Sequence, residues 1–342
     1  MRHPKSDSQS RGLIKEMSPW LLHGSLWIGL VTAFLISIDV GNIKISFLEM
    51  LFQPAHSDAS VVFWDIRLPR ALLGLLVGAT LGLSGAAMQG FLRNPLAEPG
   101  VLGVTGGAAL GAVLVFYTGI FSVFSMALPL GGIFGAFLSV LFLYLLAGSM
   151  SSVQTLILAG VSMNVIAFSG TSLALNLSKD PYAVLDIVFW QMGSLADRSF
   201  HHVFLILPFI LIGWVLLLWD RRALDALSLG EEAAASLGIN LKKMQLRMII
   251  GTAFCVGAAV SVCGSIGFVG LVVPHLLRPL VANQPGKLLV VSALGGAILL
   301  LLSDIAVRLI PVAVELKLGV LTSLVGAPFF MILILQMRRK LL

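Results

Sequence analysis

Long apolar runs separated by short polar connections dominate the 342-residue chain. Ten runs are distinguishable, and each is predicted to be a helix because none alternates apolar and polar positions as a membrane-spanning strand does. In order, they are Trp20–Val40, Leu68–Gln89, Pro99–Tyr117, Phe121–Ala147, Val153–Leu175, His202–Trp219, Met248–Cys263, Phe268–Val281, Leu288–Ile310 and Leu318–Gln336. Several fall short of the roughly 20 residues that a full span needs. Phe268–Val281 contains Pro274 and is expected to be a broken or half-membrane helix.

The composition is that of an integral membrane protein. Hydrophobic residues make up 58% of the chain and charged residues 11%, whereas about 25% of a soluble domain is charged. The predicted fold class is therefore an all-α membrane protein with about ten transmembrane helices. Its two cysteines, Cys255 and Cys263, lie in one apolar run and are expected to be small buried residues rather than metal ligands or a disulfide framework.

The distribution of basic residues predicts the orientation in the membrane. With ten spans, both termini lie on one side; if that side is cytoplasmic, 15 of the 22 Lys and Arg residues lie inside and 7 outside, in agreement with the positive-inside rule. The outside set is Lys44, Arg67, Arg70, Lys179, Arg198, Arg308 and Lys317. The predicted organisation is a cytoplasmic tail (1–19), one transmembrane domain (20–337) with a cytoplasmic loop (220–247), and a basic cytoplasmic tail (338–342). The net charge of +6 then reflects topology and not nucleic-acid binding.

The polar segment from about Asp220 to Arg247 interrupts the apolar pattern. Within it, Glu232–Gly238 begins with an acidic residue and ends with a glycine, as short solvated helices do. A water-exposed helix in so apolar a chain is expected to be a contact site for another protein.

Glycines recur at every fourth position in three of the apolar runs. The sets are Gly74, Gly78 and Gly82; Gly103, Gly107 and Gly111; and Gly131 and Gly135. On a helix each set forms one stripe, along which a second backbone can approach closely. The stripes predict a compact bundle, held by static close packing or built with surfaces that slide during transport.

Catalytic motifs are missing from the sequence. It contains no G-x-x-x-x-G-K-[ST] phosphate loop, no H-E-x-x-H and no G-x-S-x-G. Intramembrane charge is scarce: Asp304 is the main candidate, and Arg308, four residues on, is expected to pair with it. An ion-coupled secondary transporter needs buried carboxylates and inverted repeats, and an intramembrane enzyme needs a polar catalytic pair, so neither alternative is favoured.

Several motifs, in order along the chain, carry a family resemblance. They are Arg67–Arg70, Gly85–Gln89, Arg93–Gly103, Leu158–Val161, Trp190–Leu195, Gly267–His275 and Gly326–Phe330. From about Trp20 to Gln336 the chain resembles the FecCD family, the permease subunits of type II ABC importers for iron–siderophore complexes, haem and vitamin B12.

The resemblance implies a multi-subunit machine in the bacterial inner membrane. Two permease copies, or a permease and a paralogue, form a central pathway surrounded by membrane lipid. Two cytoplasmic ATPase subunits carry ATP and Mg, so this chain is expected to hold no cofactor or metal and to be no enzyme. A periplasmic binding protein delivers the ligand.

The resemblance also assigns residues to three sites. Expected to dock the binding protein are Arg67, Arg70 and Arg308, whose guanidinium groups suit carboxylates on that partner. Expected to form the cytoplasmic gate are Asn94, Leu96, Val153 and Gln154. Expected to couple to the ATPase are Gly230, Glu231, Glu232, Ala233, Ala234 and Gly238. For the arginines, the alternative is anchoring of helix ends at the headgroups, and for the gate residues it is a plain helix connection.

The substrate is left open by the sequence. A ferric siderophore is the first choice, as the commonest substrate in the family, followed by vitamin B12 and then haem. His201, His202 and His275 lie near predicted membrane boundaries and are expected to be interfacial or packed residues rather than haem ligands.

Overall fold

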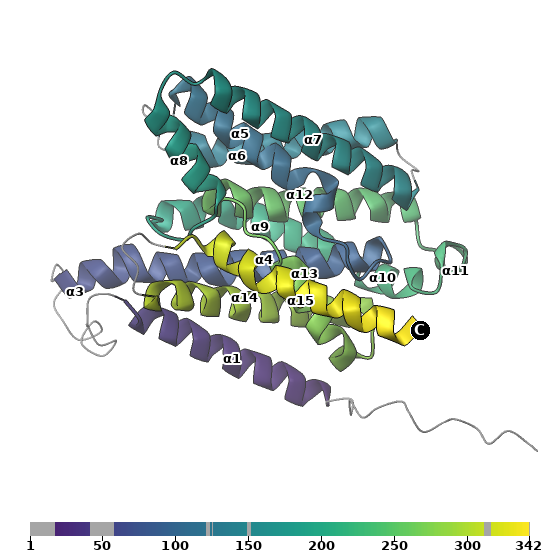
Figure 1. Cartoon of the computed structure of the whole chain (residues 1–342). Helices are drawn as coiled ribbons and strands as arrows, with labels where there is room; N and C mark the ends of the chain where they lie inside the picture. Colours follow the sequence, from purple (N-terminus) through teal and green to yellow (C-terminus); the bar gives the residue numbers. More distant parts are fainter. Residues whose placement is uncertain are drawn as a thin grey trace, which may run out of the picture.

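The computed structural model describes residues 18–41, 58–120, 124, 126–148, 152–310 and 316–341, and all regular structure within these ranges is helical. The helices form an elongated bundle (Figure 1). They are α1 (Pro19–Asp39), α3 (Asp58–Val61), the π-helix η1 (Val62–Arg67), α4 (Leu68–Phe91), the 3-10 helix η2 (Pro99–Leu102), α5 (Val104–Thr118), α6 (Ala127–Ala147), α7 (Val153–Leu177), α8 (Pro181–Gln191), α9 (Phe200–Trp219), α10 (Arg221–Leu227), α11 (Glu231–Ser236), α12 (Leu241–Cys263), α13 (Val269–Leu277), the 3-10 helix η4 (Arg278–Val281), α14 (Pro285–Leu309) and α15 (Leu318–Leu341).

Seven helical stretches of the described chain are long and apolar enough to cross a membrane, and three shorter apolar helices accompany them. The shorter ones are Val104–Thr118, Val269–Val281 and Leu318–Leu333. Together they match the ten predicted apolar segments, so the all-α membrane fold is confirmed.

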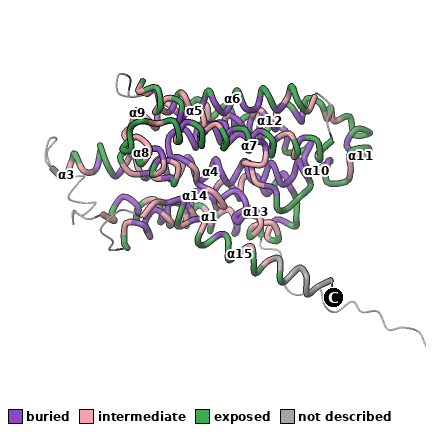
Figure 2. The backbone as a smooth tube through the Cα atoms, turned by 45° about the horizontal axis from the view of Figure 1, so that its top comes forward, coloured by how far each residue is buried: buried purple, intermediate pink, exposed green. Residues whose placement is uncertain are grey.

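Two helices form the centre of the bundle. The spanning window of α4 is 83% buried and that of α12 is 78% buried, whereas the windows of α1, α7 and α9 are each 28% buried. Figure 2 shows this contrast, with α4 and α12 mostly purple and α6, α7 and α15 largely green on their outer faces. Apolar side chains exposed on the outer helices suit contact with lipid.

The glycine stripes bring helix backbones into close contact. A Cβ at Gly82 on α4 would lie 2.0 Å from the carbonyl oxygen of Ser292 on α14, and one at Gly111 on α5 would lie 2.1 Å from that of Gly131 on α6. No residue larger than glycine fits at such a distance, because real Cβ atoms do not approach within 3.0 Å. The predicted close packing is therefore confirmed for α4 with α14 and for α5 with α6.

Several helix boundaries differ from those predicted. The second helix extends back to Asp58. Pro69 has no N–H to donate, and the helix continues across it because the preceding turns, Val62–Arg67, adopt wider π-helical geometry. The third run is a 3-10 turn until Leu102 and becomes α-helix only at Val104, after Gly103 with φ +79°. The fourth helix begins at Ala127, and positions 121–123 of the predicted run lie outside the described residues.

Two further differences concern polar sequence. The helix predicted from Met248 begins at Leu241, since the Asn240 side chain caps it by accepting from the Lys243 N–H at 3.0 Å. Helix α8, with its N-cap Asp180, was not among the ten predicted segments because its 11 residues are too short to span.

The segment expected to be broken or half-membrane is a short α-helix that continues through Pro274 to Leu277 and is supported by a neighbouring helix. Pro274 cannot donate to the carbonyl group of Gly270, and the buried side chain of Gln89 on α4 donates instead to Gly270 at 3.5 Å and Leu271 at 3.3 Å. Arg278 donates to the Gln89 amide oxygen and so fixes its orientation. The short α13 is thus held by hydrogen bonds from the core helix.

Both ends of the described chain lie at one end of the bundle. The start of α1 and the end of α15 are on the same side as α10 and α11, while α3 lies at the opposite end (Figure 1). Helix α4 joins the two ends, and its 24 residues span about 36 Å at 1.5 Å per residue. We refer to them as the α11 end and the α3 end.

Candidate functional site

The polar segment at the α11 end is anchored to the bundle on both sides of its exposed part. Arg247 on α12 forms an ion pair with Asp220, which is 3% exposed and directly precedes α10. Asp225 on α10 accepts a hydrogen bond from the Gly286 N–H at 2.7 Å, and Arg221 donates to the Gly286 carbonyl oxygen at 3.1 Å. Helix α10 is therefore fixed to α12 and to the start of α14.

Helix α11 extends from this anchored base into solvent. Helix α11 follows Gly230, whose φ is +113°, and its C-terminal turn closes at Gly238, whose φ is +81°. The Gly238 N–H donates to the carbonyl oxygen of Ala235, and the Ile239 N–H donates to that of Ala234. This pair of bonds is a Schellman motif, in which the left-handed residue favours glycine. The predicted coupling residues Gly230, Glu231, Glu232, Ala233, Ala234 and Gly238 thus form one compact turn–helix–turn.

The outer surface of this unit combines two exposed leucines with the exposed Glu231, Glu232 and Ser236. Only Ala234 of α11 is buried, whereas Leu229 is 72% exposed and Leu237 is 65% exposed. These two leucines flank α11, and sequence reasoning did not select them, although an exposed leucine on each side of a short polar helix is a signal of a protein contact.

The predicted gate residues lie next to this unit. The Asn94 side chain accepts from the Leu96 N–H at 2.9 Å, which makes the turn after α4 rigid. Val153 and Gln154, at the start of α7, line a cavity of about 160 Å³ whose wall also includes Arg93, Leu227 and Glu231. The structure therefore brings the start of α7 and the coupling segment around one cavity, while Asn94 and Leu96 lie outside its wall.

The three predicted docking arginines gather at the α3 end. Arg70 and Arg308 both pair with Asp304, at 3.0 and 2.9 Å, and the Asp304 side chain is 1% exposed. The predicted Asp304–Arg308 ion pair is confirmed, and Arg70 is a second partner that was not predicted.

Two of these arginines also hold the end of α1. Arg67 donates to the carbonyl oxygens of Ile38 and Asp39 at 3.0 and 2.8 Å, and Arg308 donates to those of Ser37 and Val40 at 2.8 and 2.7 Å. Both satisfy carbonyl groups that the helix end leaves open. Arg67 is 4% exposed and holds the end of α1 from within the chain, and both docking and headgroup anchoring stay predictions.

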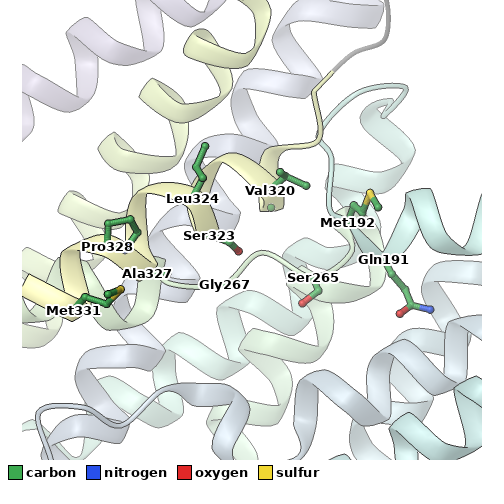
Figure 3. Close-up of a pocket in the computed structure, with 11 residues that line it drawn as sticks. Gln191, Met192, Ser265, Gly267, Val320, Ser323, Leu324, Ala327, Pro328 and Met331 are labelled. Atoms are coloured by element: carbon green, nitrogen blue, oxygen red, sulfur yellow. The ribbon is translucent and has the colours of Figure 1, made fainter.

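A groove of about 700 Å³ lies between the end of α8, the connection at 264–268 and α15 (Figure 3). Its lining residues are Gln191, Met192, Ser265, Gly267, Gly319, Val320, Ser323, Leu324, Ala327, Pro328 and Met331. None of them is charged, so the groove suits a large ligand with mixed apolar and neutral polar surface.

Helix α7 exposes polar side chains along its length, as α6 and α9 do not, and α1 does so at Ser25, Thr32 and Asp39. Every exposed side chain on α6 is apolar, and so is every one on α9 beyond its first turn. On α7, by contrast, four exposed polar residues recur at every seventh position: Thr155, Ser162, Ser169 and Asn176. Polar side chains are unfavourable against lipid tails, so this stripe favours contact with water or with another protein.

Side chains that could bind a metal are not clustered in the part of the chain that the structure describes. No group of three or more His, Cys, Asp or Glu side chains there is close enough to hold a metal. Cys255 and Cys263 are free and buried, as predicted. The ring of His275 packs edge-on against Phe329, with centroids 6.0 Å apart, in agreement with a packed residue.

Comparison with known proteins agrees with this architecture. The sequence model of the FecCD transport family matches residues 29–336. The hemin transport system permease protein HmuU of Yersinia pestis is 37% identical over 95% of this chain and 98% of its own. The vitamin B12 import system permease protein BtuC of Salmonella paratyphi A is 37% identical over 94% and 96%.

A solved structure extends the likeness to three dimensions. A metal-chelate type ABC transporter in an inward-facing conformation superimposes with a TM-score of 0.82 at 34% identity, over 93% of this chain and 100% of that one. These matches cover nearly the whole chain, and they agree with the helical architecture. The chain therefore belongs to the FecCD transport family and is an ABC importer permease.

Proposed function

We propose that this permease forms the pathway for a bulky metal chelate, with a ferric siderophore as the first candidate, and that two cytoplasmic ATPase subunits drive it through α11. The observation that carries the proposal is the exposure of α11 between anchored ends. Leu229 and Leu237 present apolar surface at the polar end of a membrane protein, where no lipid tail covers it. ATP and Mg belong to the ATPase in this scheme, and the permease transmits the work.

The proposed orientation has the α11 end in the cytoplasm. The distribution of 15 inside and 7 outside basic residues supports it. The α3 end then faces the periplasm or the cell exterior, where a substrate-binding protein would approach Arg70 and Arg308, whose side chains are 14% and 10% exposed. Arg67 would contribute by holding the end of α1.

A second permease copy, or a paralogue, is proposed to face α7. The polar stripe of Thr155, Ser162, Ser169 and Asn176 supports a water-filled pathway on this side of the molecule. The uncharged groove of Figure 3 supports a ligand that needs no ion pair with the wall.

The substrate proposal starts from shared chemistry. Relatives are named for hemin and for vitamin B12, and the structural neighbour for a metal chelate; all three descriptions denote metal complexes of large organic ligands. A ferric siderophore belongs to the same class. Vitamin B12 and haem stay as second candidates because named relatives carry them.

Uptake by intact cells tests the substrate. Cells lacking the gene, and the same cells complemented with it, would be given a ⁵⁵Fe-loaded hydroxamate or catecholate siderophore, radiolabelled cyanocobalamin, or ⁵⁵Fe-hemin. Complementation is expected to restore accumulation of a ferric siderophore at least tenfold. Restoration of cyanocobalamin or hemin uptake alone would replace the first candidate by the second, and restoration of none would contradict the chelate proposal.

A further inference from the structure

Arg93 adopts a backbone conformation that normally belongs to glycine. At the end of α4 its φ is +49°, its N–H donates to Gly90 at 3.3 Å, and the N–H of Asn94 donates to Gln89 at 3.1 Å. This is the same Schellman motif that ends α11, where the left-handed residue is Gly238. A residue with a Cβ is disfavoured in that conformation, so the backbone alone would favour glycine at position 93.

The side chain of Arg93 reaches the first residue of α11. One of its terminal nitrogens lies 2.7 Å from Oε1 of Glu231, and the two side chains are 44% and 56% exposed. Of the ion pairs between described residues, this one alone joins α11 to the end of a spanning helix. Arg93 directly precedes the gate turn at 94–96, which contains Asn94 and Leu96. The ion pair therefore links the coupling segment directly to the gate turn.

The surroundings leave room for this link to move. Arg93 and Glu231 both line the 160 Å³ cavity, together with Ser152 and Gln154 from the start of α7 and Gln245 from α12. The other side chains on the wall are apolar or uncharged, so no second charge competes for Arg93 there. A shift of α11 can therefore move the turn after α4 with it, without displacing packed core side chains.

We propose that Arg93 and Glu231 are positioning residues that transmit movement of α11 to the gate turn at 94–96. The inference rests on the proposed function, in which α11 receives the ATPase and this turn closes the pathway. It adds the specific physical connection between the two. The guanidinium suits this role because it keeps its charge and directs several N–H groups at a carboxylate.

A single reporter cysteine in the gate turn tests the link. Leu96 is 37% exposed and is replaced in the variant Leu96→Cys; the native Cys255 and Cys263 are buried and should not react. Inside-out membrane vesicles containing the assembled transporter are treated with a membrane-impermeant maleimide, with MgATP and vanadate or without nucleotide. The measured quantity is the ratio of the two labelling rates.

The informative variant is Arg93→Gly, because glycine suits the backbone of that position and keeps the fold intact. It is expected to reduce the nucleotide-dependent ratio by about two- to fivefold, the range of an exposed ion pair. The charge exchange Arg93→Glu with Glu231→Arg is expected to restore the ratio. Arg222→Ala removes another exposed arginine at the same end, on α10, and should leave the ratio unchanged.

The outcomes distinguish failure of the Arg93–Glu231 link from failure of the proposed coupling through α11. An Arg93→Gly ratio equal to that of the parent would overturn the link while leaving coupling through α11 intact. An equal loss in Arg222→Ala would overturn it too, as a general charge effect. A parent transporter whose labelling does not respond to nucleotide would overturn both the gate assignment and the link.

Discussion

Replacing Asp304 by asparagine is predicted to destabilise the α3 end strongly. Its carboxylate, 1% exposed, accepts from Arg70 at 3.0 and 3.2 Å and pairs with Arg308 at 2.9 Å. Removing its charge takes away the carboxylate that two guanidinium groups share in a site where the carboxylate is almost fully buried. Breaking a buried pair from one side costs about 3–5 kcal/mol, and at about 2 °C per kcal/mol for a chain of this size the apparent Tm should fall by about 6–10 °C.

The assay is thermal unfolding of the purified permease in detergent, followed by tryptophan fluorescence. Asp186→Asn, an exposed carboxylate on α8, is the matched control and should change Tm by less than about 2 °C, as surface substitutions do. The double variant Asp304→Asn with Arg70→Met should be more stable than Asp304→Asn alone, because it also removes one of the two cations that the carboxylate held, while Arg308 keeps its acceptors on α1. If Asp304→Asn unfolds within about 2 °C of the control, the buried carboxylate does not hold this end together.

Three further outcomes follow from the packing and the hydrogen bonds. Gln89→Met keeps the volume but leaves the Gly270 carbonyl, which Pro274 cannot serve, without the amide donor, so the apparent Tm should fall by about 2–6 °C; an unchanged Tm would show that the amide is dispensable. Gly82→Ala, whose Cβ would meet the Ser292 carbonyl oxygen at 2.0 Å, should destabilise by about 1–3 kcal/mol, whereas Gly24→Ala, with open space around it, should not. Burial raises the pKa of Glu98 above its ordinary value of 4.5, although the hydrogen bond from the Phe268 N–H acts in the opposite direction. Because the folded state favours the protonated carboxyl group, the wild-type Tm should decline as pH rises from 4.5 through the raised pKa. Glu98→Gln should lose that decline in a pH series of melting curves, and an identical profile would refute the assignment.

Local rules allowed part of this molecule to be predicted. Gly238 was recognisable as a helix end because a left-handed residue favours glycine, and the Asp304–Arg308 pair because residues four apart share a helix face. The ten apolar segments follow from length and hydrophobicity alone.

The remainder depends on contacts between distant residues. Arg70 meets Asp304 across 234 positions, and Arg93 meets Glu231 across 138, separations that no spacing rule connects. The left-handed conformation of Arg93 could not be predicted because the sequence shows an arginine where the motif favours glycine. The apolar pattern predicted a helix start at Leu68, whereas π-turns extend the helix back to Asp58.

Site-specific photo-crosslinking measures whether α11 contacts an ATPase subunit. A benzophenone amino acid would replace Leu237, 65% exposed beside α11, or Phe134, 67% exposed on α6. Membranes containing the assembled transporter would be irradiated and the adducts identified by mass spectrometry. We expect an adduct with an ATP-binding-cassette subunit from position 237 and none from position 134. No such adduct at position 237, or equal yields at both positions, would contradict contact between α11 and the ATPase.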